Sequence, residues 1–358
     1  IKTYQNYIIK SFSKIFLYVF FIFLFLTIIL NIFEEISFFK NTNVSLLFPL
    51  YMTFLNTPSV IYETFPFIFF IATQFFFIRL LDREELDIFK KISLSNTKLI
   101  LILSTFSLII SGLIIIIFYN LSSNLKFLYL DIKNKYSKDN KYLAVVTENG
   151  LWIRDEIDDK INIINAEALD NQTLKNVSIN QFSKNYDIIL NIVATEVNIE
   201  NNNWVIKKGK FSENNSSLKI KENYLFKTNF NALRINQLFS DLSSLNFIEL
   251  NNIRKNYEKV GYTINSINVH IHKLISYPFY LTIMTILGSI VMLNIKRNKS
   301  KIFHIILGTL FSVLIYYISY FSGLLGQNER LPLIFSIWLP LIVIALFCLI
   351  GLVRINEK

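Results

Sequence analysis

The sequence has one cysteine, three histidines and nine glycines in 358 residues, and each scarcity excludes a class of site. The single cysteine, Cys348, cannot form a disulfide within the chain, so a domain outside the cytoplasm must fold by packing alone. No glycine belongs to a G-x-x-x-x-G-K-S/T motif, which excludes the P-loop mode of ATP binding. His270 and His272 are two residues apart and would point to different faces of a helix. We therefore expect no metal, no cofactor and no catalytic residue in this chain.

Long uncharged hydrophobic blocks are what the sequence does contain. The chain is 53% hydrophobic, and blocks such as Ile15–Phe33 and Leu99–Tyr119 hold no charge at all. About 20 apolar residues are enough to cross a bilayer as a helix. Ile15–Phe33 is too long for a cleaved signal peptide, and no small-x-small cleavage site follows it. The sequence predicts six membrane spans, at 15–33, 59–81, 99–120, 274–295, 302–325 and 331–353.

The distribution of charge predicts the orientation. The net charge of +10 could suggest nucleic acid, but the basic residues gather beside the apolar blocks, as they do at cytoplasmic anchors. We therefore expect no nucleic-acid partner, both termini in the cytoplasm of a bacterium, and residues 121–273 outside the inner membrane. The basic residues on the predicted cytoplasmic side are Lys2, Lys10, Lys14, Arg83, Lys90, Lys91, Lys98, Lys296, Arg297, Lys299, Lys301, Arg354 and Lys358.

The segment between the third and fourth spans differs in kind. Short runs rich in Ile, Val and aromatic residues alternate with Asn, Asp, Gly and Ser, which is typical of antiparallel strands. We predict strands at 142–147, 151–154, 161–166, 187–198, 204–207 and 217–228, with a hairpin turn at Asn149-Gly150. The predicted fold is a helical membrane protein of three plus three spans with an inserted periplasmic β-jelly-roll or sandwich. The predicted domains are 1–120, the sheet domain 121–230, a helical bridge 231–273 (helices at 233–242 and 247–260), and 274–358.

The loop between the second and third spans predicts a short amphipathic helix, residues 82–92, on the cytoplasmic face. Asp82 would cap its start with Glu85 three residues later. Leu86, Phe89 and Ile92 share one apolar stripe. Such a helix either docks a soluble partner or rests on lipid headgroups, and composition leaves both alternatives open.

The outer ends of two spans carry further candidates. Glu35 and Lys40 lie where the first span leaves the membrane, and either bind an ionic headgroup or form a solvated helix end. Tyr316, Tyr317 and Tyr320 lie in the outer half of the fifth span, facing either substrate or the interfacial aromatic belt. The sequence shows no charged pair mid-membrane, where a proton-coupled pump would usually need one.

Several motifs follow one another in the order of a known family. The sequence resembles the LptF/LptG permeases, in which three spans, a periplasmic β-jelly-roll and three further spans follow in that order. Residues 150–154, Gly-Leu-Trp-Ile-Arg, look more like the LptG branch than LptF. Ser93 departs from the family's usual glycine after the cytoplasmic helix. The matching motifs are Tyr7-Ile8-Ile9-Lys10, Thr57-Pro58, Phe65-Pro66, Arg83-Glu84-Glu85-Leu86, Leu331-Pro332 and Trp338-Leu339-Pro340.

The resemblance implies a permease subunit that extracts lipopolysaccharide from the outer leaflet of the inner membrane and passes it to a periplasmic bridge. The implied partners are an LptF-like permease subunit, a dimer of LptB-like cytoplasmic ATPases, and LptC-like and LptA-like periplasmic proteins. Arg83, Glu84, Glu85, Leu86 and Phe89 would belong to the helix that couples to the ATPase. The first and fifth spans would form a lateral gate with Glu35, Lys40, Tyr316, Tyr317 and Tyr320 as lipid-gate or headgroup candidates. The alternatives are another ABC-type permease or mechanotransmitter with a periplasmic domain, and a non-transporting membrane scaffold.

Overall fold

The computed structural model divides the chain into two compact units, residues 1–126 with 265–358, and residues 127–264. The structure describes residues 3–40, 42, 44–45, 47–136, 151–157, 160–170, 172–185, 187–213, 219–232, 235, 241–260, 264–294 and 301–356. The predicted strand at 142–147, the turn at Asn149-Gly150 and most of the predicted helix at 233–242 lie outside these residues. The predicted domain limits remain predictions.

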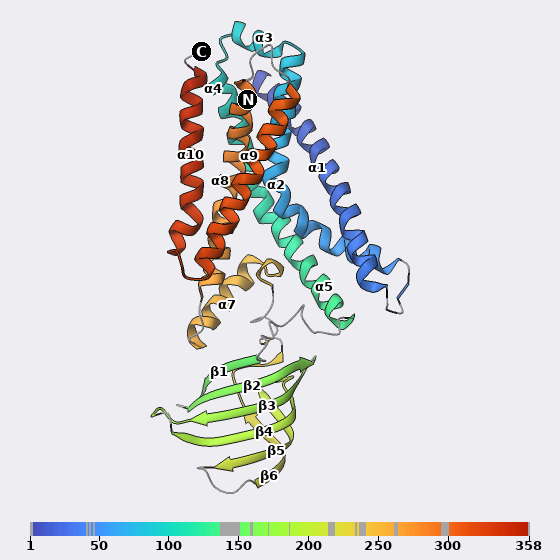
Figure 1. Ribbon diagram of the computed structural model, residues 1–358, viewed down its shortest axis with the longest axis vertical. Helices are drawn as coiled ribbons and strands as arrows, with labels where there is room; N and C mark the ends of the chain where they lie inside the picture. The colour runs from blue at the N-terminus through green and yellow to red at the C-terminus, as the bar shows by residue number, and fades with distance from the viewer. Residues whose placement is uncertain are drawn as a thin grey trace. The chain divides into compact units, whose positions relative to one another are not determined.

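The first unit consists of helices (Figure 1). Six helical stretches are long and apolar enough to cross a membrane, so the prediction of six spans is confirmed. The third of them runs from α4 through a π-helical segment, η1, into α5. The helices are α1 (Thr3–Phe39), α2 (Phe48–Asp82), α3 (Glu85–Lys91), α4 (Asn96–Leu113), η1 (Ile114–Tyr119), α5 (Asn120–Tyr136, which continues into the second unit), α8 (Asn265–Leu293), α9 (Lys301–Gln327) and α10 (Leu333–Asn356).

Prolines inside these helices create contacts between them. The predicted second span begins at residue 59, directly after Pro58, but α2 begins at Phe48 and includes both Pro58 and Pro66. A proline has no N–H, so it leaves the carbonyl four residues earlier without its helical donor. The Tyr277 hydroxyl of α8 donates to the carbonyl of Tyr62, which Pro66 leaves free. The same arrangement occurs in α10. Pro340 leaves the Ser336 carbonyl without its helical donor, and the Ser322 hydroxyl of α9 donates a hydrogen bond to that carbonyl at 2.6 Å.

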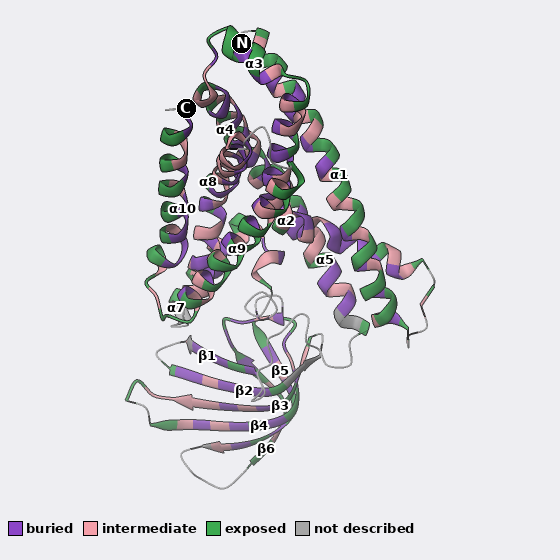
Figure 2. Cartoon of the chain, turned by 45° about the horizontal axis from the view of Figure 1, so that its top comes forward, coloured by how far each residue is buried: buried purple, intermediate pink, exposed green. Residues whose placement is uncertain are grey.

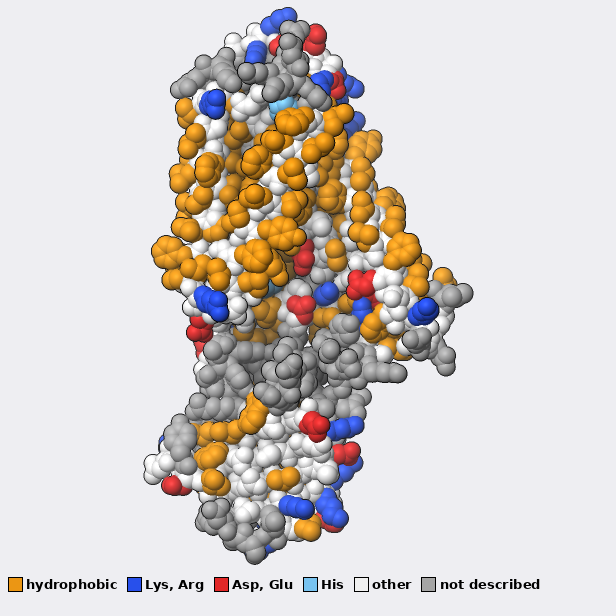
Figure 3. Space-filling model, in the orientation of Figure 1, with side chains coloured by type: hydrophobic (Ala, Val, Ile, Leu, Met, Phe, Trp, Pro, Cys, Tyr) orange, Lys and Arg blue, Asp and Glu red, His pale blue; other side chains and the backbone are white. Residues whose placement is uncertain are grey.

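Aromatic packing forms the core of the helical unit. Phe12 of α1 packs edge-on against Phe76 of α2, with ring centroids 5.7 Å apart, and Phe16 packs in the same way against Phe69 at 4.9 Å. By contrast, much of α1 and α10 is exposed (Figure 2). In Figure 3, hydrophobic side chains cover the middle of the visible face of the helical unit, and charged side chains gather toward the two ends of that unit. Water cannot solvate this surface favourably, so the unit requires lipid around it.

The second unit contains one six-stranded antiparallel sheet. Its strands are β1 (Leu151–Ile157), β2 (Lys160–Asp170), β3 (Thr173–Phe182), β4 (Ile188–Asn198), β5 (Asn203–Glu213) and β6 (Lys219–Lys227). Each strand pairs with its neighbour in sequence, in the order β1-β2-β3-β4-β5-β6. The predicted inserted sheet is therefore confirmed. The jelly roll is not confirmed, because short connections between successive strands build a meander, whereas a jelly roll needs crossing connections.

The sequence analysis missed β3 because buried and exposed side chains do not alternate regularly along this strand. Leu174 and Val177 are both buried although they are three residues apart, because Asn176 adopts a left-handed backbone with φ of 48° between them. The pairing with β4 omits Asn176 at the same point. The register against β4 is unchanged across this point, with Lys175 opposite Glu196 and Val177 opposite Ala194, so no residue is inserted. The local change of backbone conformation lets both side chains face the core and hides the period-two pattern from the sequence. The same spacing recurs on β4, where Ala194 and Val197 are both buried.

The segment after β6 folds back and closes the sheet. Phe230, Ala232 and Ile235 join the buried core of the sheet. The Trp204 indole donates to the Phe230 carbonyl at 2.7 Å. Asp155 of β1 accepts hydrogen bonds from the Thr228 hydroxyl at 2.7 Å and from the Asn229 backbone at 3.0 Å. The sheet is therefore curved around its own C-terminal segment, which the short helices η2 (Leu242–Ser244) and α7 (Phe247–Val260) follow.

Candidate functional site

Helix α3 lies between α2 and α4 and is held against the helical unit by its apolar face. Leu86 and Phe89 are buried and belong to the same core cluster as Ile8, Phe12 and Leu80. These two side chains therefore anchor the helix to its own chain. The third member of the predicted stripe, Ile92, is 57% exposed, and Ile88 is 54% exposed. The exposed apolar side chains of α3 and its C-cap are therefore Ile88 and Ile92.

The predicted cap of this helix is wrong. Asp82 is the last residue of α2, and its carboxylate contacts the ammonium of Lys301 at the start of α9. Glu84 occupies the cap position of α3 with a left-handed backbone, φ of 55°, and it forms no side-chain cap. Of these two carboxylates, that of Asp82 therefore forms an inter-helix ion pair and that of Glu84 lies on the exposed surface. The sequence pattern could not indicate this, because Lys301 is 219 residues away.

Glu85 faces the first helix of its own chain. The Tyr7 hydroxyl of α1 donates to Glu85 Oε1 at 2.9 Å, and Arg83 Nη1 lies 3.9 Å from the same oxygen. Tyr7 belongs to the opening motif that the sequence comparison with the LptF/LptG permeases singled out. Its hydroxyl links the beginning of α1 to the beginning of α3.

Ser93 keeps a glycine-like backbone after α3. Its φ is 60°, in the left-handed region that costs a non-glycine residue about 1–2 kcal/mol. Ser93 N donates to the Lys90 carbonyl at 3.0 Å, and Leu94 N donates to the Phe89 carbonyl at 2.9 Å. The serine therefore preserves the turn that the family's usual glycine would form.

We expect Ser93→Gly to leave this turn intact and Ser93→Val to loosen it. A β-branched residue is strongly disfavoured at positive φ, whereas glycine adopts it freely. In hydrogen exchange of the full chain, Ser93→Val should speed exchange of the Leu94 amide about fivefold, which corresponds to about 1 kcal/mol. Equal exchange in both variants would show that backbone strain at this position does not matter.

The outer end of the helical unit, named here after the predicted orientation, is the end at which α1 ends, α8 begins and α9 ends. Glu35 is completely buried near the end of α1, whereas Lys40 is exposed after it. The two predicted headgroup candidates therefore lie in different environments. Only Lys40 is directly available to a ligand in solution.

The tyrosines of α9 divide between two faces. Tyr316 stacks on Tyr320, with ring centroids 6.3 Å apart, and its ring lies 5.4 Å from that of Phe67 on α2. Tyr317 is 53% exposed and stacks on Phe321, which is also exposed. Tyr316 and Tyr320 thus belong to the side of α9 that approaches α2, and Tyr317 belongs to the outward side.

The sequence analysis missed Lys273 of α8 and Glu63 of α2. Lys273 directly precedes the predicted fourth span, but α8 begins eight residues earlier and includes it. The Glu63 carboxylate attracts the Lys273 ammonium, so two opposite charges interact inside helices that can span a membrane. The expectation that no charged pair lies mid-membrane stays a prediction. A basic residue beside an apolar stretch was the only sequence signal, and it is also typical of an interfacial anchor.

The two neighbouring histidines have different partners. His270 Nε2 lies 3.0 Å from the Tyr119 hydroxyl of η1. His272 Nδ1 accepts a hydrogen bond from the Trp338 indole of α10 at 3.3 Å. Both of these ring nitrogens therefore take part in contacts between helices.

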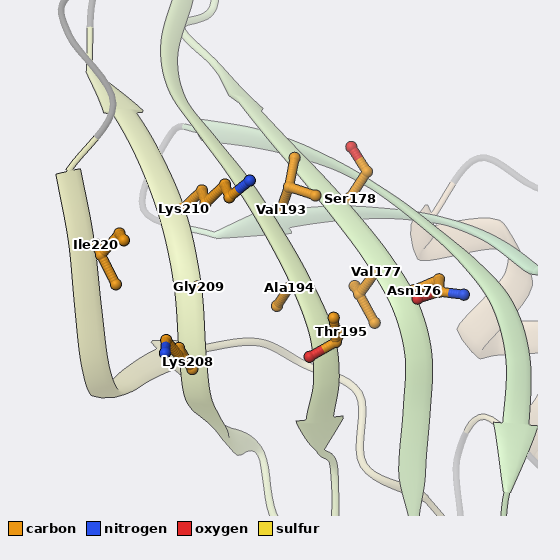
Figure 4. Close-up of a pocket in the computed structure, with 10 residues that line it drawn as sticks. All are labelled: Asn176, Val177, Ser178, Val193, Ala194, Thr195, Lys208, Gly209, Lys210 and Ile220. Atoms are coloured by element: carbon orange, nitrogen blue, oxygen red, sulfur yellow. The ribbon is translucent and has the colours of Figure 1, made fainter.

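The sheet carries a hollow of 360 Å³ (Figure 4). Its walls come from four neighbouring strands, β3 to β6, and include exposed apolar side chains such as Val193 and Ile220. Lys208 and Lys210 lie on either side of Gly209 in the same strand. The hollow therefore combines apolar and basic groups, and nothing in the described residues identifies an occupant.

Comparison with known proteins identifies the family. No curated protein matches the chain. The sequence model described as "Lipopolysaccharide export system permease LptF/LptG" matches residues 6–354, which is nearly the whole chain and includes both units. This chain belongs to the LptF/LptG family of lipopolysaccharide export permeases of the inner membrane.

Proposed function

We propose that this permease subunit extracts lipopolysaccharide from the outer leaflet of the inner membrane and passes it to a periplasmic bridge. The energy comes from a separate cytoplasmic ATPase, because the sequence contains no P-loop. The cost of extraction is large, since each CH₂ group moved from lipid to water costs about 0.8 kcal/mol. The inserted sheet, on the periplasmic side, receives the acyl chains and aligns with LptC-like and LptA-like proteins.

Helix α3 carries this proposal. It is fixed to the bundle by Leu86 and Phe89, it is tied to α1 through Glu85 and Tyr7, and it presents Ile88 outward. A helix that merely rested on lipid headgroups would not need a hydrogen bond to the first span. These contacts are suited to transmit a push from a docked ATPase to α1, one of the two proposed gate helices.

The second proposed gate helix, α9, is weakly embedded in the unit. Its buried residues are mostly small, namely Gly308, Ser312, Ile315, Gly323 and Gly326. Small residues let neighbouring helices approach closely, but most of the large side chains of α9 are exposed, so much of this helix is open to lipid or to a second subunit. An LptF-like subunit would face the gate from the other side and complete the cavity for the acyl chains. The motif at residues 150–154 favours the LptG role for this chain.

The proposal is tested by isolating the detergent-solubilised chain from a host that expresses it with a cognate LptB-like ATPase. We expect the ATPase to co-purify, and we expect Glu85→Ala to reduce its recovery several-fold because α3 loses its tie to Tyr7. Tyr7→Phe, which removes only the hydroxyl, should reproduce part of the loss. Failure of the wild-type chain to retain an ATPase would contradict the proposal and favour a mechanotransmitter or a scaffold that lacks this partner.

A further inference from the structure

Helix α9 changes its neighbours along its length. Its first half lies against α2, where the ammonium of Lys301 contacts the carboxylate of Asp82. Its second half lies against other helices, since Gly323 contacts the Lys273 side chain of α8 and the Ser322 hydroxyl donates to a carbonyl of α10. The two halves of α9 are therefore held by different parts of the helical unit.

Gln74 of α2 forms a buried polar contact with the first half of α9. Its side chain is completely buried, and its Nε2 donates to the backbone carbonyl of His304 at 3.2 Å. In an α-helix that carbonyl also accepts from the N–H four residues later, which is that of Gly308, so Gln74 supplies a second donor to it. The glutamine therefore binds the backbone of α9, and the contact does not depend on a side-chain rotamer of that helix.

Gly308 brings α9 close enough for this hydrogen bond. A Cβ atom at this position would collide with the Gln74 amide and would lie 3.0 Å from Cζ of the Phe70 ring. The end of an exposed glutamine could move aside, but Gln74 and Phe70 are both completely buried. Phe70 also belongs to the same buried cluster as Met284 and Ile315. Because neither side chain has exposed space to move into, the close approach of the two helices requires a glycine here.

Two simpler explanations do not account for Gln74. A side chain that only filled space between membrane helices would be apolar, because a buried amide costs free energy unless its groups are hydrogen-bonded. Gln74 Oε1 has no hydrogen-bond partner among the residues that the structure describes, so the amide is not fully satisfied. The ion pair of Asp82 and Lys301 cannot replace the contact, because these side chains are 51% and 45% exposed and exposed ion pairs contribute little. What the buried amide adds is therefore the bond from α2 to α9.

The same end of α2 carries α3. Leu86 and Phe89 of α3 pack in one buried cluster with Leu80, which lies near the end of α2. From these contacts we infer that Gln74 is a positioning residue that makes the first half of α9 move together with α3. A displacement of α3 by the ATPase would then reach α9 through α2, by a route that does not pass through α1. This inference rests on the proposed function and adds to it a connection to the second gate helix.

Distances between spin labels on α3 and α9 test the contact in the chain alone. The labels are placed at Lys90 and Ile306, which are both exposed, in a Cys348→Ala background in nanodiscs. Wild type should give a single distance between the labels. Gln74→Leu, which keeps a side chain of similar size but cannot donate, should raise the population of a second, longer distance about tenfold.

Two further variants separate this contact from general disturbance of the bundle. Gly308→Ala should also populate the longer distance, because the added methyl group displaces the Gln74 amide and the Phe70 ring. Thr73→Val is the matched control in the same turn of α2. The Thr73 hydroxyl donates to the Phe69 carbonyl of its own helix at 2.7 Å, so its removal should leave the wild-type distance.

A second measurement tests the role of the contact in the assembled complex. It determines the amount of lipopolysaccharide exported per ATP hydrolysed when the chain is reconstituted with its permease partner and the cognate ATPase. Gln74→Leu should lower this ratio several-fold while ATP hydrolysis continues at the wild-type rate, and Thr73→Val should keep the ratio of wild type. A purely structural defect would lower hydrolysis and export together.

The outcomes separate this inference from the proposed function. The wild-type distance in Gln74→Leu would show that the glutamine does not hold α9, which overturns the inference. An unchanged ratio of export to hydrolysis in Gln74→Leu, or a parallel loss of both, overturns the route through α2 and leaves the export function standing. Absence of export by the wild-type complex overturns the proposed function, and the label distances then still decide whether Gln74 holds α9 to α2.

Discussion

Replacing Trp204 with alanine is expected to destabilise the sheet unit by about 3–5 kcal/mol, the largest stability effect of any single side chain discussed here. Trp204 is completely buried at the centre of the sheet's core. Its indole N–H donates to the Phe230 carbonyl at 2.7 Å, and its ring lies 6.3 Å from that of Phe226. The substitution therefore creates a cavity and also releases the segment that closes the sheet.

Hydrogen exchange of the full chain in detergent measures this effect locally. Amides of β4 to β6 should exchange at least 100-fold faster in Trp204→Ala, while those of α2 and α8 remain unchanged. Trp204→Phe is the matched variant, because it retains an aromatic ring but loses the hydrogen bond, and it should produce a smaller increase. A Trp204→Ala chain with wild-type exchange in the sheet would mean that residues 228–235 do not stabilise it.

The six spans could be predicted from sequence because lipid imposes a simple requirement. A helix that crosses a bilayer must satisfy its backbone hydrogen bonds internally and must be apolar over about 20 residues. The limits of the helices were less predictable. The predicted second span begins directly after Pro58, yet α2 begins at Phe48 and continues through Pro58 and Pro66. Hydroxyl groups such as that of Tyr277 bind the carbonyls that prolines leave free.

The sheet shows a different limit of the sequence pattern. Alternation predicted five of the strands that the structure describes, but the left-handed backbone at Asn176 interrupts the alternation within β3 and concealed that strand. The connection order could not be derived either, because short strands with turns between them fit a jelly roll and a meander equally well. Only the pairing of each strand with its sequence neighbour distinguishes the two.

For the candidate sites, the sequence predicted the kind of surface that a segment presents but not what that surface contacts. The spacing of Leu86 and Phe89 indicated an apolar face, but it could not say whether that face meets a partner or the chain itself. Lys273 lies directly before the predicted fourth span, which begins nine residues after the start of α8, and its contact with Gly323 joins residues 50 positions apart. Contacts of this kind depend on the packing of one helix against another, which local patterns do not encode.

Replacing Ile88 with aspartate is expected to weaken binding of the partner ATPase about thirtyfold. Ile88 is the exposed apolar residue at the middle of α3, while the opposite face of the helix is anchored by Leu86 and Phe89. Apolar residues buried at the centre of a protein interface commonly contribute 2 kcal/mol or more, and an aspartate would bring an additional desolvation cost. Because Ile88 makes no part of the chain's own core, α3 should keep its fold.

The measurement is a titration of the purified ATPase against the chain in nanodiscs. Ile220→Asp is the matched control, since it introduces the same charge at an exposed isoleucine of the sheet and should leave the affinity unchanged. A helix that rested on lipid headgroups would respond differently, because Ile88→Asp would then loosen its contact with the membrane and leave the ATPase bound. Wild-type affinity in Ile88→Asp would therefore remove α3 from the coupling path and require another contact to deliver the energy for extraction.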